Sequence, residues 1–173
     1  MTLSLAELNA LSRSEAAERF RACCGSSRWV DAMIARRPFT GIETLLGAAD
    51  QEWRESTAAD RDEAFAHHPR IGERHAAAPV GAAARQWSAD EQGAAARADD
   101  VTRARMVEAN AAYERRFGRI YIVCATGRSA GDLLADIETR LKNDPERERK
   151  VAGEEQRKII RLRLLKLLGV ERT

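Results

Sequence analysis

The sequence is poor in aromatic residues, which make up 5% of its 173 positions. Few aromatic side chains leave few surfaces on which the bases of single-stranded nucleic acid could stack. An excess of one charge is also lacking, because 29 Lys and Arg stand against 27 Asp and Glu, for a formal net charge of +2. No overall field therefore draws the protein to nucleic acid or to a membrane surface. We expect a small-molecule partner, no nucleic acid and no membrane.

Long apolar runs and a cysteine framework are missing as well. No run approaches the roughly 20 apolar residues that a membrane helix needs, and the first residues, Met-Thr-Leu-Ser, lack the basic and apolar regions of a secretory leader. The three cysteines, Cys23, Cys24 and Cys124, are odd in number and do not have metal-site spacing. These observations predict an untargeted, cytoplasmic protein with reduced thiols.

Helix signals, in contrast, recur along the whole chain. Three pairs have the capping-box spacing, in which side chains satisfy the free backbone donors of a helix start: Ser12 with Glu15, Thr40 with Glu43, and Ser88 with Glu91. Together with stops at glycine and proline, they predict helices over about 5–9, 13–24, 28–37, 41–55, 58–67, 89–117, 130–142 and 145–168. For the helix over 89–117, a break near Gly93 is an alternative. The chain length suits one domain. We therefore predict an all-α fold, a single-domain helical bundle of about seven to nine helices over residues 1–173.

Two segments between these helices are of interest. Residues 73–86 are rich in alanine and have no durable apolar stripe, which predicts a loop at the rim of a site. Residues 120–125, Ile-Tyr-Ile-Val-Cys-Ala, form the only strand-like run. A lone strand cannot pair its backbone groups within a sheet. These groups are therefore candidates to face a ligand.

The last predicted helix is amphipathic and carries a candidate anion ligand. Apolar residues recur at spacings of three, which predicts one buried stripe: Ile159, Leu162, Leu165 and Leu168. Arg163 is expected elsewhere on the helical wheel. Its guanidinium group could clamp a ligand carboxylate through two parallel hydrogen bonds, or it could be a solvated arginine on a charged helix.

The segment His67-His68-Pro69-Arg70-Ile71-Gly72 is the most informative part of the chain. Proline fixes its own φ and biases the preceding residue away from the helical region, so His68 should lie where a helix ends. This placement suits a catalytic imidazole. It also fits an ordinary helix end, because the negative end of the helix dipole favours histidine.

Other interpretations of the polar residues remain open from the pattern alone. His67, His68 and His75 with Glu73 could suggest a metal site, but adjacent histidines project in different directions and no His-x-x-x-His pair is present. We therefore expect no metal. Glu91 could act as a catalytic acid, or it could only complete the capping box with Ser88.

Taken together, these motifs resemble the 2-oxo-4-hydroxy-4-carboxy-5-ureidoimidazoline (OHCU) decarboxylases of urate degradation. The resemblance covers about two thirds of the chain. Its blocks are His68-Pro69-x-Ile71-Gly72, Ser88-x-x-Glu91-Gln92-Gly93, Asn110-x-x-Tyr113-x-x-Arg116-Phe117-Gly118, Tyr121-Ile122-Val123-Cys124-Ala125, Arg140-Leu141-x-Asn143 and Glu155-x-x-Lys158-Ile159-x-x-x-Arg163-Leu164. Each block is weak alone, but their order and spacing are specific.

The resemblance implies an all-helical lyase that uses no metal and no organic cofactor and converts OHCU to (S)-allantoin with loss of carbon dioxide. His68, Glu91 and Arg163 would be catalytic. The implied substrate-binding residues are Pro69, Ser88, Gln92, Tyr121, Ile122, Val123, Cys124 and Ala125. The last five would offer backbone groups, which agrees with the absence of a sheet partner.

The chain departs from the family pattern at a few points. Tyr121 stands where phenylalanine is frequent, and His67 duplicates the motif histidine, although only His68 directly precedes the proline. Two other functions are alternatives: a helical interaction module without catalytic activity, whose binding surface would be the last helix, and a related lyase or hydrolase acting on a different ring. The sequence does not fix the oligomeric state, and a homodimer is one expected assembly.

Overall fold

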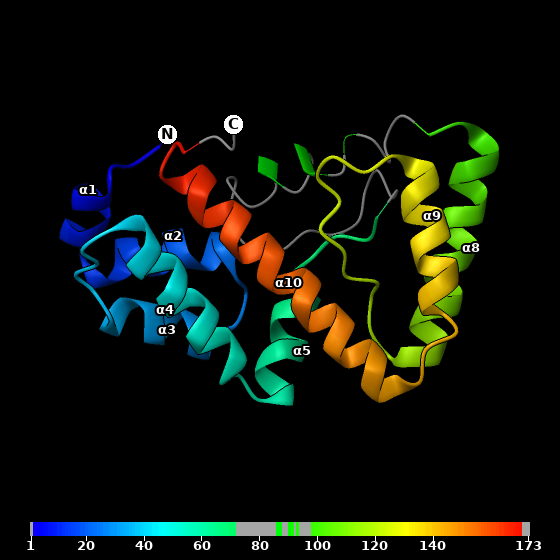
Figure 1. The fold of residues 1–173 in the computed structure, drawn as a ribbon, viewed down its shortest axis with the longest axis horizontal. Helices are drawn as coiled ribbons and strands as arrows, with labels where there is room; N and C mark the ends of the chain where they lie inside the picture. The colour runs from blue at the N-terminus through cyan, green and yellow to red at the C-terminus, as the bar shows by residue number, and fades with distance from the viewer. Residues whose placement is uncertain (1, 72–85, 88–89, 92, 94–97, 171–173) are drawn as a thin grey trace. The chain divides into compact units, whose positions relative to one another are not determined.

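A computed structural model describes residues 2–71, 86–87, 90–91, 93 and 98–170. The elements in these ranges are all helices (Figure 1): α1 (Leu5–Ala10), α2 (Arg13–Cys23), α3 (Ser27–Ala35), α4 (Ile42–Arg54), α5 (Ala58–Ala66), α8 (Asp100–Phe117), α9 (Ala130–Arg140) and α10 (Pro145–Leu167). No strand forms within the described ranges. The predicted all-α class is confirmed, whereas the loop expected at 73–86 lies almost wholly outside the described residues. None of the described helices is long and apolar enough to cross a membrane.

The chain divides into two compact units. The first comprises residues 1–64 and 157–173, and the second comprises residues 65–156. Helices α5 and α10 contribute residues to both units. The expectation of a single domain over 1–173 stays a prediction.

The first unit is held together by short helices with well-formed caps. Ser12 and Glu15 form the predicted capping box at α2, and Ser4 forms a second box at α1. The predicted box of Thr40 with Glu43 is wrong, because α4 is capped one residue later. There the Gly41 N–H donates to the Thr44 hydroxyl at 3.0 Å. Side-chain oxygens near a helix start compete for the same donors, so spacing alone did not identify the cap.

The core of the first unit is built around one tryptophan. Trp29 of α3 is fully buried, meets Phe20 edge-on with ring centroids 6.0 Å apart, and donates its indole N–H to the Ala49 carbonyl at 3.1 Å. A buried indole needs such an acceptor. The contact joins α3 to α4.

Helix α10 keeps the predicted start at Pro145 and ends just before Gly169, whose φ is +67°. The predicted apolar stripe is wrong, because only Ile159 of its four members is buried and Leu162, Leu165 and Leu168 are half-buried. A step of three residues falls about 60° short of a full turn, so a run of threes drifts around the helix. The buried side chains instead follow spacings of three and four: Ile159, Ile160, Arg163, Leu164 and Leu167.

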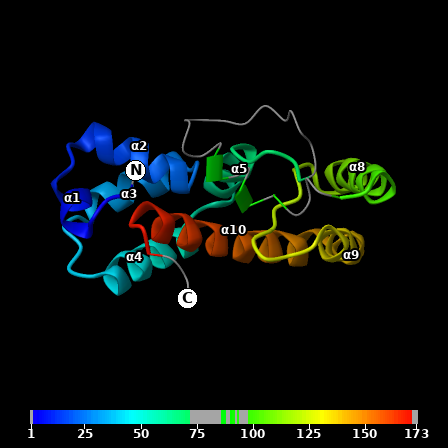
Figure 2. The same ribbon diagram turned by 90° about the horizontal axis from the view of Figure 1, so that it is seen from above.

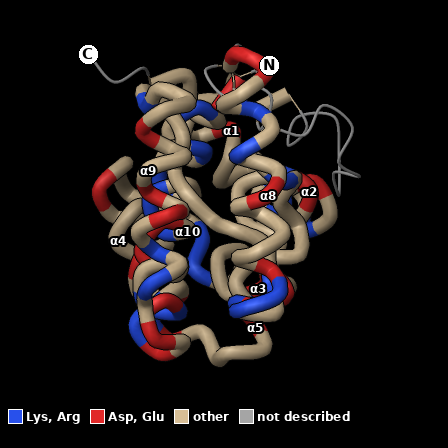
Figure 3. The backbone as a smooth tube through the Cα atoms, turned by 90° about the vertical axis from the view of Figure 1, so that its right-hand side faces the viewer, with Lys and Arg blue, Asp and Glu red and all other residues tan. Residues whose placement is uncertain are grey.

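In the second unit, α8 and α9 lie side by side (Figures 1 and 2) and run in the same direction. Their apolar faces enclose a core that includes Tyr113, Leu133 and Ile137. Figure 3 shows basic and acidic residues interspersed along both helices. A parallel pair needs a connection that returns along its whole length, and residues 118–129 form it.

Helix α8 is shorter than predicted. The helix expected over 89–117 begins only at Asp100, because the Asp99 carboxylate accepts the Thr102 N–H at 2.8 Å and caps a new start. Residues 86–87, 90–91 and 93 are helical but separate from it. The predicted stop at Gly118 is confirmed, with φ +67°.

Candidate active site

The histidine motif follows the end of α5. Helix α5 stops at Ala66, and the His68 N–H donates to the Phe65 carbonyl at 3.1 Å. His68 and Pro69 are both half-buried. The predicted helix end before Pro69 is therefore confirmed, with His68 on a turn rather than in the helix.

Two side chains of α8 fix the residues that follow His68 and Pro69. The Arg70 guanidinium donates to both carboxylate oxygens of Glu114, with Nη2 to Oε2 at 2.9 Å. One turn earlier, the buried Asn110 amide donates to the Ile71 carbonyl at 2.8 Å. Because Asn110 and Glu114 are four residues apart, they share one helix face. The turn is thus held by two polar contacts to a single helix.

The ion pair at this turn also sets the charge of its acid. The side-chain hydrogen bonds from Arg70 hold the pKa of the Glu114 carboxyl below its ordinary value. Arg70 remains 42% exposed, so water screens much of the attraction.

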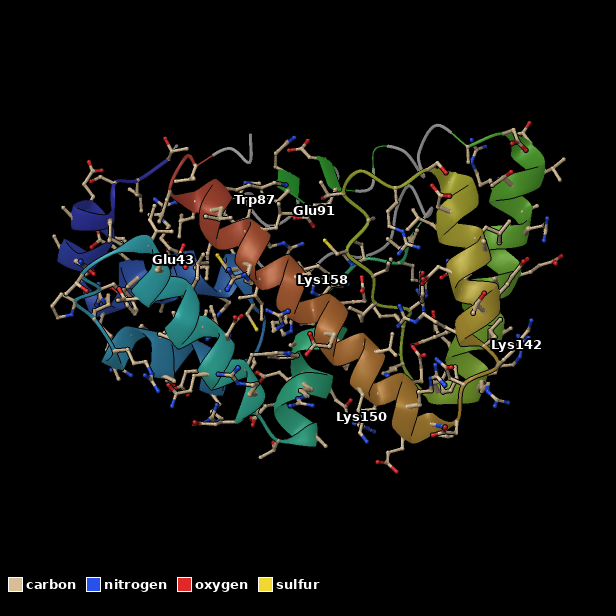
Figure 4. The ribbon with its side chains drawn as sticks, viewed as in Figure 1. Glu43, Trp87, Glu91, Lys142, Lys150 and Lys158 are labelled. Atoms are coloured by element: carbon tan, nitrogen blue, oxygen red, sulfur yellow. The ribbon has the colours of Figure 1, made fainter. Side chains whose placement is uncertain are left out.

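Glu91 is buried, at 9% exposure. It is labelled in Figure 4 together with Trp87, and both come from the short helical pieces that precede α8. Ser88 and Gln92, the other candidate ligands of this motif, lie outside the described residues, and so does the capping box of Ser88 with Glu91.

The segment Tyr121–Ala125 forms no strand, and several of its backbone groups already have protein partners. The Ile122 carbonyl accepts from Arg140 Nη1 at 2.9 Å, and the Cys124 N–H donates to Glu155 Oε2 at 2.9 Å. The Ala125 carbonyl accepts the Arg128 N–H at 3.1 Å. These three groups therefore have partners within the protein, and the expectation that the segment offers backbone groups to a ligand stays a prediction. Side chains of α9 and α10 take the place of a neighbouring strand.

Arg140 belongs to a buried polar cluster that the pattern analysis did not identify. Arg140 and Glu148 are 5% and 0% exposed, and Arg140 Nη2 lies 2.5 Å from Glu148 Oε1. The Tyr113 hydroxyl and the Asn143 amide also donate to the Glu148 carboxylate, the latter at 2.8 Å. The hydrogen bonds and the ion pair among these side chains offset the free energy that each group loses when it is removed from water.

The tyrosines of this region are held neutral. Burial is the main cause that raises the pKa of Tyr113, and the hydrogen bond to the Glu148 carboxylate raises this pKa further. Burial, then hydrogen bonding to Asp136, likewise raises the pKa of Tyr121, whose ring lies 4.7 Å from the Arg140 guanidinium carbon. Neither hydroxyl is therefore suited to act as a base.

Arg163 lies in the first unit, while His68, Glu91 and residues 121–125 lie in the second. It is buried, at 4% exposure, and its Nη1 donates to the Ala22 carbonyl at 3.3 Å. The interpretation of Arg163 as a solvated arginine is wrong, as is its placement away from the buried face of α10.

Among the described residues, no group of three or more histidine, cysteine or acidic side chains could hold a metal ion. Cys23, Cys24 and Cys124 are all free thiols. Burial raises the pKa of the Cys24 thiol to about 12, so this group stays protonated.

Comparison with known proteins agrees with the motifs. The sequence model of the family described as OHCU decarboxylase matches residues 9–165. The uric acid degradation bifunctional protein TTL of Arabidopsis thaliana is 32% identical over 152 residues, which are 88% of this chain and 47% of that protein. A 2-oxo-4-hydroxy-4-carboxy-5-ureidoimidazoline decarboxylase of Amia calva is 43% identical over 61 residues, 35% of each chain. The matches thus span about half or less of these two relatives.

Solved structures share the fold. A crystal structure of OHCU decarboxylase in the presence of (S)-allantoin superposes with a TM-score of 0.76 at 29% identity, covering 88% of this chain and 98% of the other. A crystal structure of (S)-allantoin synthase has a TM-score of 0.72 at 19% identity, covering 96% and 54%, and supports the fold alone. The family match spans almost the whole sequence, and the chain belongs to the OHCU decarboxylase family.

Proposed function

We propose that this protein decarboxylates OHCU to (S)-allantoin in urate degradation, without a cofactor. The observation that carries the proposal is the turn His68–Ile71, fixed to α8 by Arg70–Glu114 and Asn110–Ile71, in a chain of this family. A neighbour at 29% identity was crystallised in the presence of (S)-allantoin. A fixed turn presents an imidazole in one orientation, which proton transfer requires.

The substrate supplies its own electron sink. The carboxylate leaves from a carbon next to a ring C=N, which accepts the electron pair as the C–C bond breaks. Carbon dioxide departs and the ring nitrogen of the C=N takes up a proton. The hydroxyl on the carbon that bore the carboxylate loses its proton as it becomes a carbonyl, and the ring carbon that bears the ureido group gains a proton, so one proton is taken up overall. Two groups that handle protons on opposite faces would give one enantiomer.

We assign these proton transfers to His68 and Glu91. Glu91 is largely shielded from water, so its carboxyl group is a candidate to exchange a proton with bound substrate rather than with solvent. Arg163 would hold the departing carboxylate out of the ring plane, so that the breaking bond aligns with the π system. Ser88, Gln92 and Pro69, with backbone groups of Tyr121–Ala125, would bind the ring.

We also propose that residues 1–173 act as one functional domain, because the family match crosses both compact units. A homodimer and a cytoplasmic location stay predictions.

The experiment that tests the function follows the circular dichroism of allantoin formed from urate. Urate oxidase and 5-hydroxyisourate hydrolase generate the substrate, with and without this protein. We expect rapid formation of one enantiomer, lost in His68→Ala and retained in the matched control His67→Ala. A slow racemic product, equal to that without the protein, would reject the decarboxylase and favour the helical interaction module. Loss in His67→Ala alone would move the catalytic role to that residue.

A further inference from the structure

Glu155 of α10 contacts the one segment expected to bind substrate through its backbone. Its Oε2 accepts the Cys124 N–H at 2.9 Å, although the side chain itself is only half-buried. We infer that Glu155 is a positioning residue, which holds residues 121–125 so that one edge of this backbone faces substrate. The inference rests on the proposed decarboxylase function.

The two anchors of this segment lie on the same edge. Residues 120–125 form neither helix nor turn, and Figure 1 shows them as part of the coil segment that connects α8 to α9. In extended backbone, the N–H and C=O of one residue point to one side, and those of the next residue point to the other. Tyr121, Val123 and Ala125 pack into one core cluster, which is the alternation of an extended chain. Ile122 and Cys124 are two residues apart, so we infer that Arg140 and Glu155 bind the same edge.

The opposite edge belongs to Tyr121 and Val123. The Ala125 carbonyl is not available there, because it accepts the Arg128 N–H. The N–H and C=O of Val123, which lies between the two anchored residues, are therefore the groups assigned to substrate. Because Val123 offers one backbone donor and one backbone acceptor, it can bind a ring that carries both hydrogen-bond acceptors and donors.

The charge of Glu155 matters to this role. A hydrogen bond from an N–H to a carboxylate is about twice as strong as one between neutral groups. The carboxylate comes from a helix of 23 residues, and sites supported by regular elements are held more accurately than sites on loops. Glu155 thus replaces the neighbouring strand that the segment lacks.

The test compares Glu155→Ala and Glu155→Gln with Glu154→Ala, a matched control at the exposed neighbouring position. Hydrogen exchange of the Cys124 amide reports the anchor without reference to activity. Steady-state kinetics of OHCU decarboxylation report the consequence. Losing a hydrogen bond to a charged acceptor should accelerate exchange of this amide about tenfold or more in Glu155→Ala.

We expect kcat/KM to fall by a similar factor, about tenfold, in Glu155→Ala, with Tm unchanged. Glu155→Gln keeps an acceptor oxygen but loses the charge, so it should show a smaller, severalfold change in both values, while Glu154→Ala should match the wild type. If Glu155→Ala does not fold, the isosteric Glu155→Gln carries the test through a severalfold change in exchange and kcat/KM.

Faster exchange of the Cys124 amide with unchanged kcat/KM would overturn the inference, because the contact would then serve folding alone. An equal loss of activity in Glu154→Ala would overturn it too. A wild type that forms no allantoin faster than the uncatalysed control would instead reject the proposed function itself, and the inference with it.

Discussion

At the scale of single residues, the sequence around Pro69 was enough to predict the histidine turn, but not the side chains of α8 that bind this turn. Pro69 limits the backbone of the preceding residue, so the end of α5 could be predicted from two adjacent residues. The partners of the turn, Asn110 and Glu114, lie about forty positions away along the chain. Contacts between residues so far apart in the sequence depend on how the helices pack against one another. A single sequence does not show this packing.

The Arg70–Glu114 pair makes acid stability a test of the turn. The pKa of Glu114 is lowered in the folded protein from an ordinary value of 4.5. A depressed carboxyl pKa adds stability that is fully present above the unfolded value and is lost as the pH falls through the folded value. Glu114→Gln should therefore be less stable than wild type near neutral pH, by less than about 1 kcal/mol because the pair is partly exposed.

That difference should shrink toward zero as the pH falls from above the ordinary value of 4.5 to below the lowered pKa of Glu114, measured by denaturant unfolding at each pH. Glu108→Gln on the exposed side of α8 is the matched control and should show no such dependence. A difference that persists unchanged at low pH would mean that the Glu114 carboxylate is not responsible for it.

At the scale of elements, existence and type were predictable wherever the signals were local. The box of Ser12 with Glu15, the start at Pro145 and the stop at Gly118 each depend on a few neighbouring residues, and each is confirmed. The start of α8 was wrong because Asp99 supplies a stronger cap than the periodicity of the preceding residues could indicate. The ends of a helix are set by individual capping hydrogen bonds. The spacing of apolar residues extends over several turns and does not locate these bonds.

The buried cluster at Glu148 joins three elements of the second unit. Its carboxylate contacts Arg140 at the end of α9, Tyr113 of α8 and Asn143 before α10. Glu148→Gln keeps the shape but removes the fully buried carboxylate that pairs with Arg140, and leaves the partly exposed Asp136, 3.4 Å from Arg140 Nη1, as the remaining acid beside this charge. Breaking a buried pair from one side costs about 3 kcal/mol or more, so we expect a loss of this size in denaturant unfolding.

The control for this substitution is Glu146→Gln on the same helix. Glu146 and its partner Lys150 are 81% and 75% exposed, and exposed pairs contribute little. Its stability should stay close to that of wild type. Equal losses in the two variants would show that the change at position 148 acts through the helix rather than through the cluster.

At the scale of the whole molecule, the sequence predicted an all-α fold and a family, and the structure adds a division into two units. The candidate residues are distributed over both, with Arg163 in the first and His68 and Glu91 in the second. A substrate that needed all three would require the units to act together. The burial of Arg163 in the first unit could not be predicted, because the expected apolar stripe was based on steps of three residues around the helical wheel.

Because α10 contributes residues to both units, we expect the two units to unfold together. It runs without interruption from Pro145 in the second unit to Leu167 in the first. Unfolding either unit removes the packing of half the helix, and short isolated helices are marginal in water. We therefore expect the slowest-exchanging amides of α2 and α8 to report the same opening free energy. Glu148→Gln should lower both by the same amount, although the substitution lies in the second unit. Protection lost in α8 but kept in α2 would show two independently unfolding units and contradict the single domain proposed for residues 1–173.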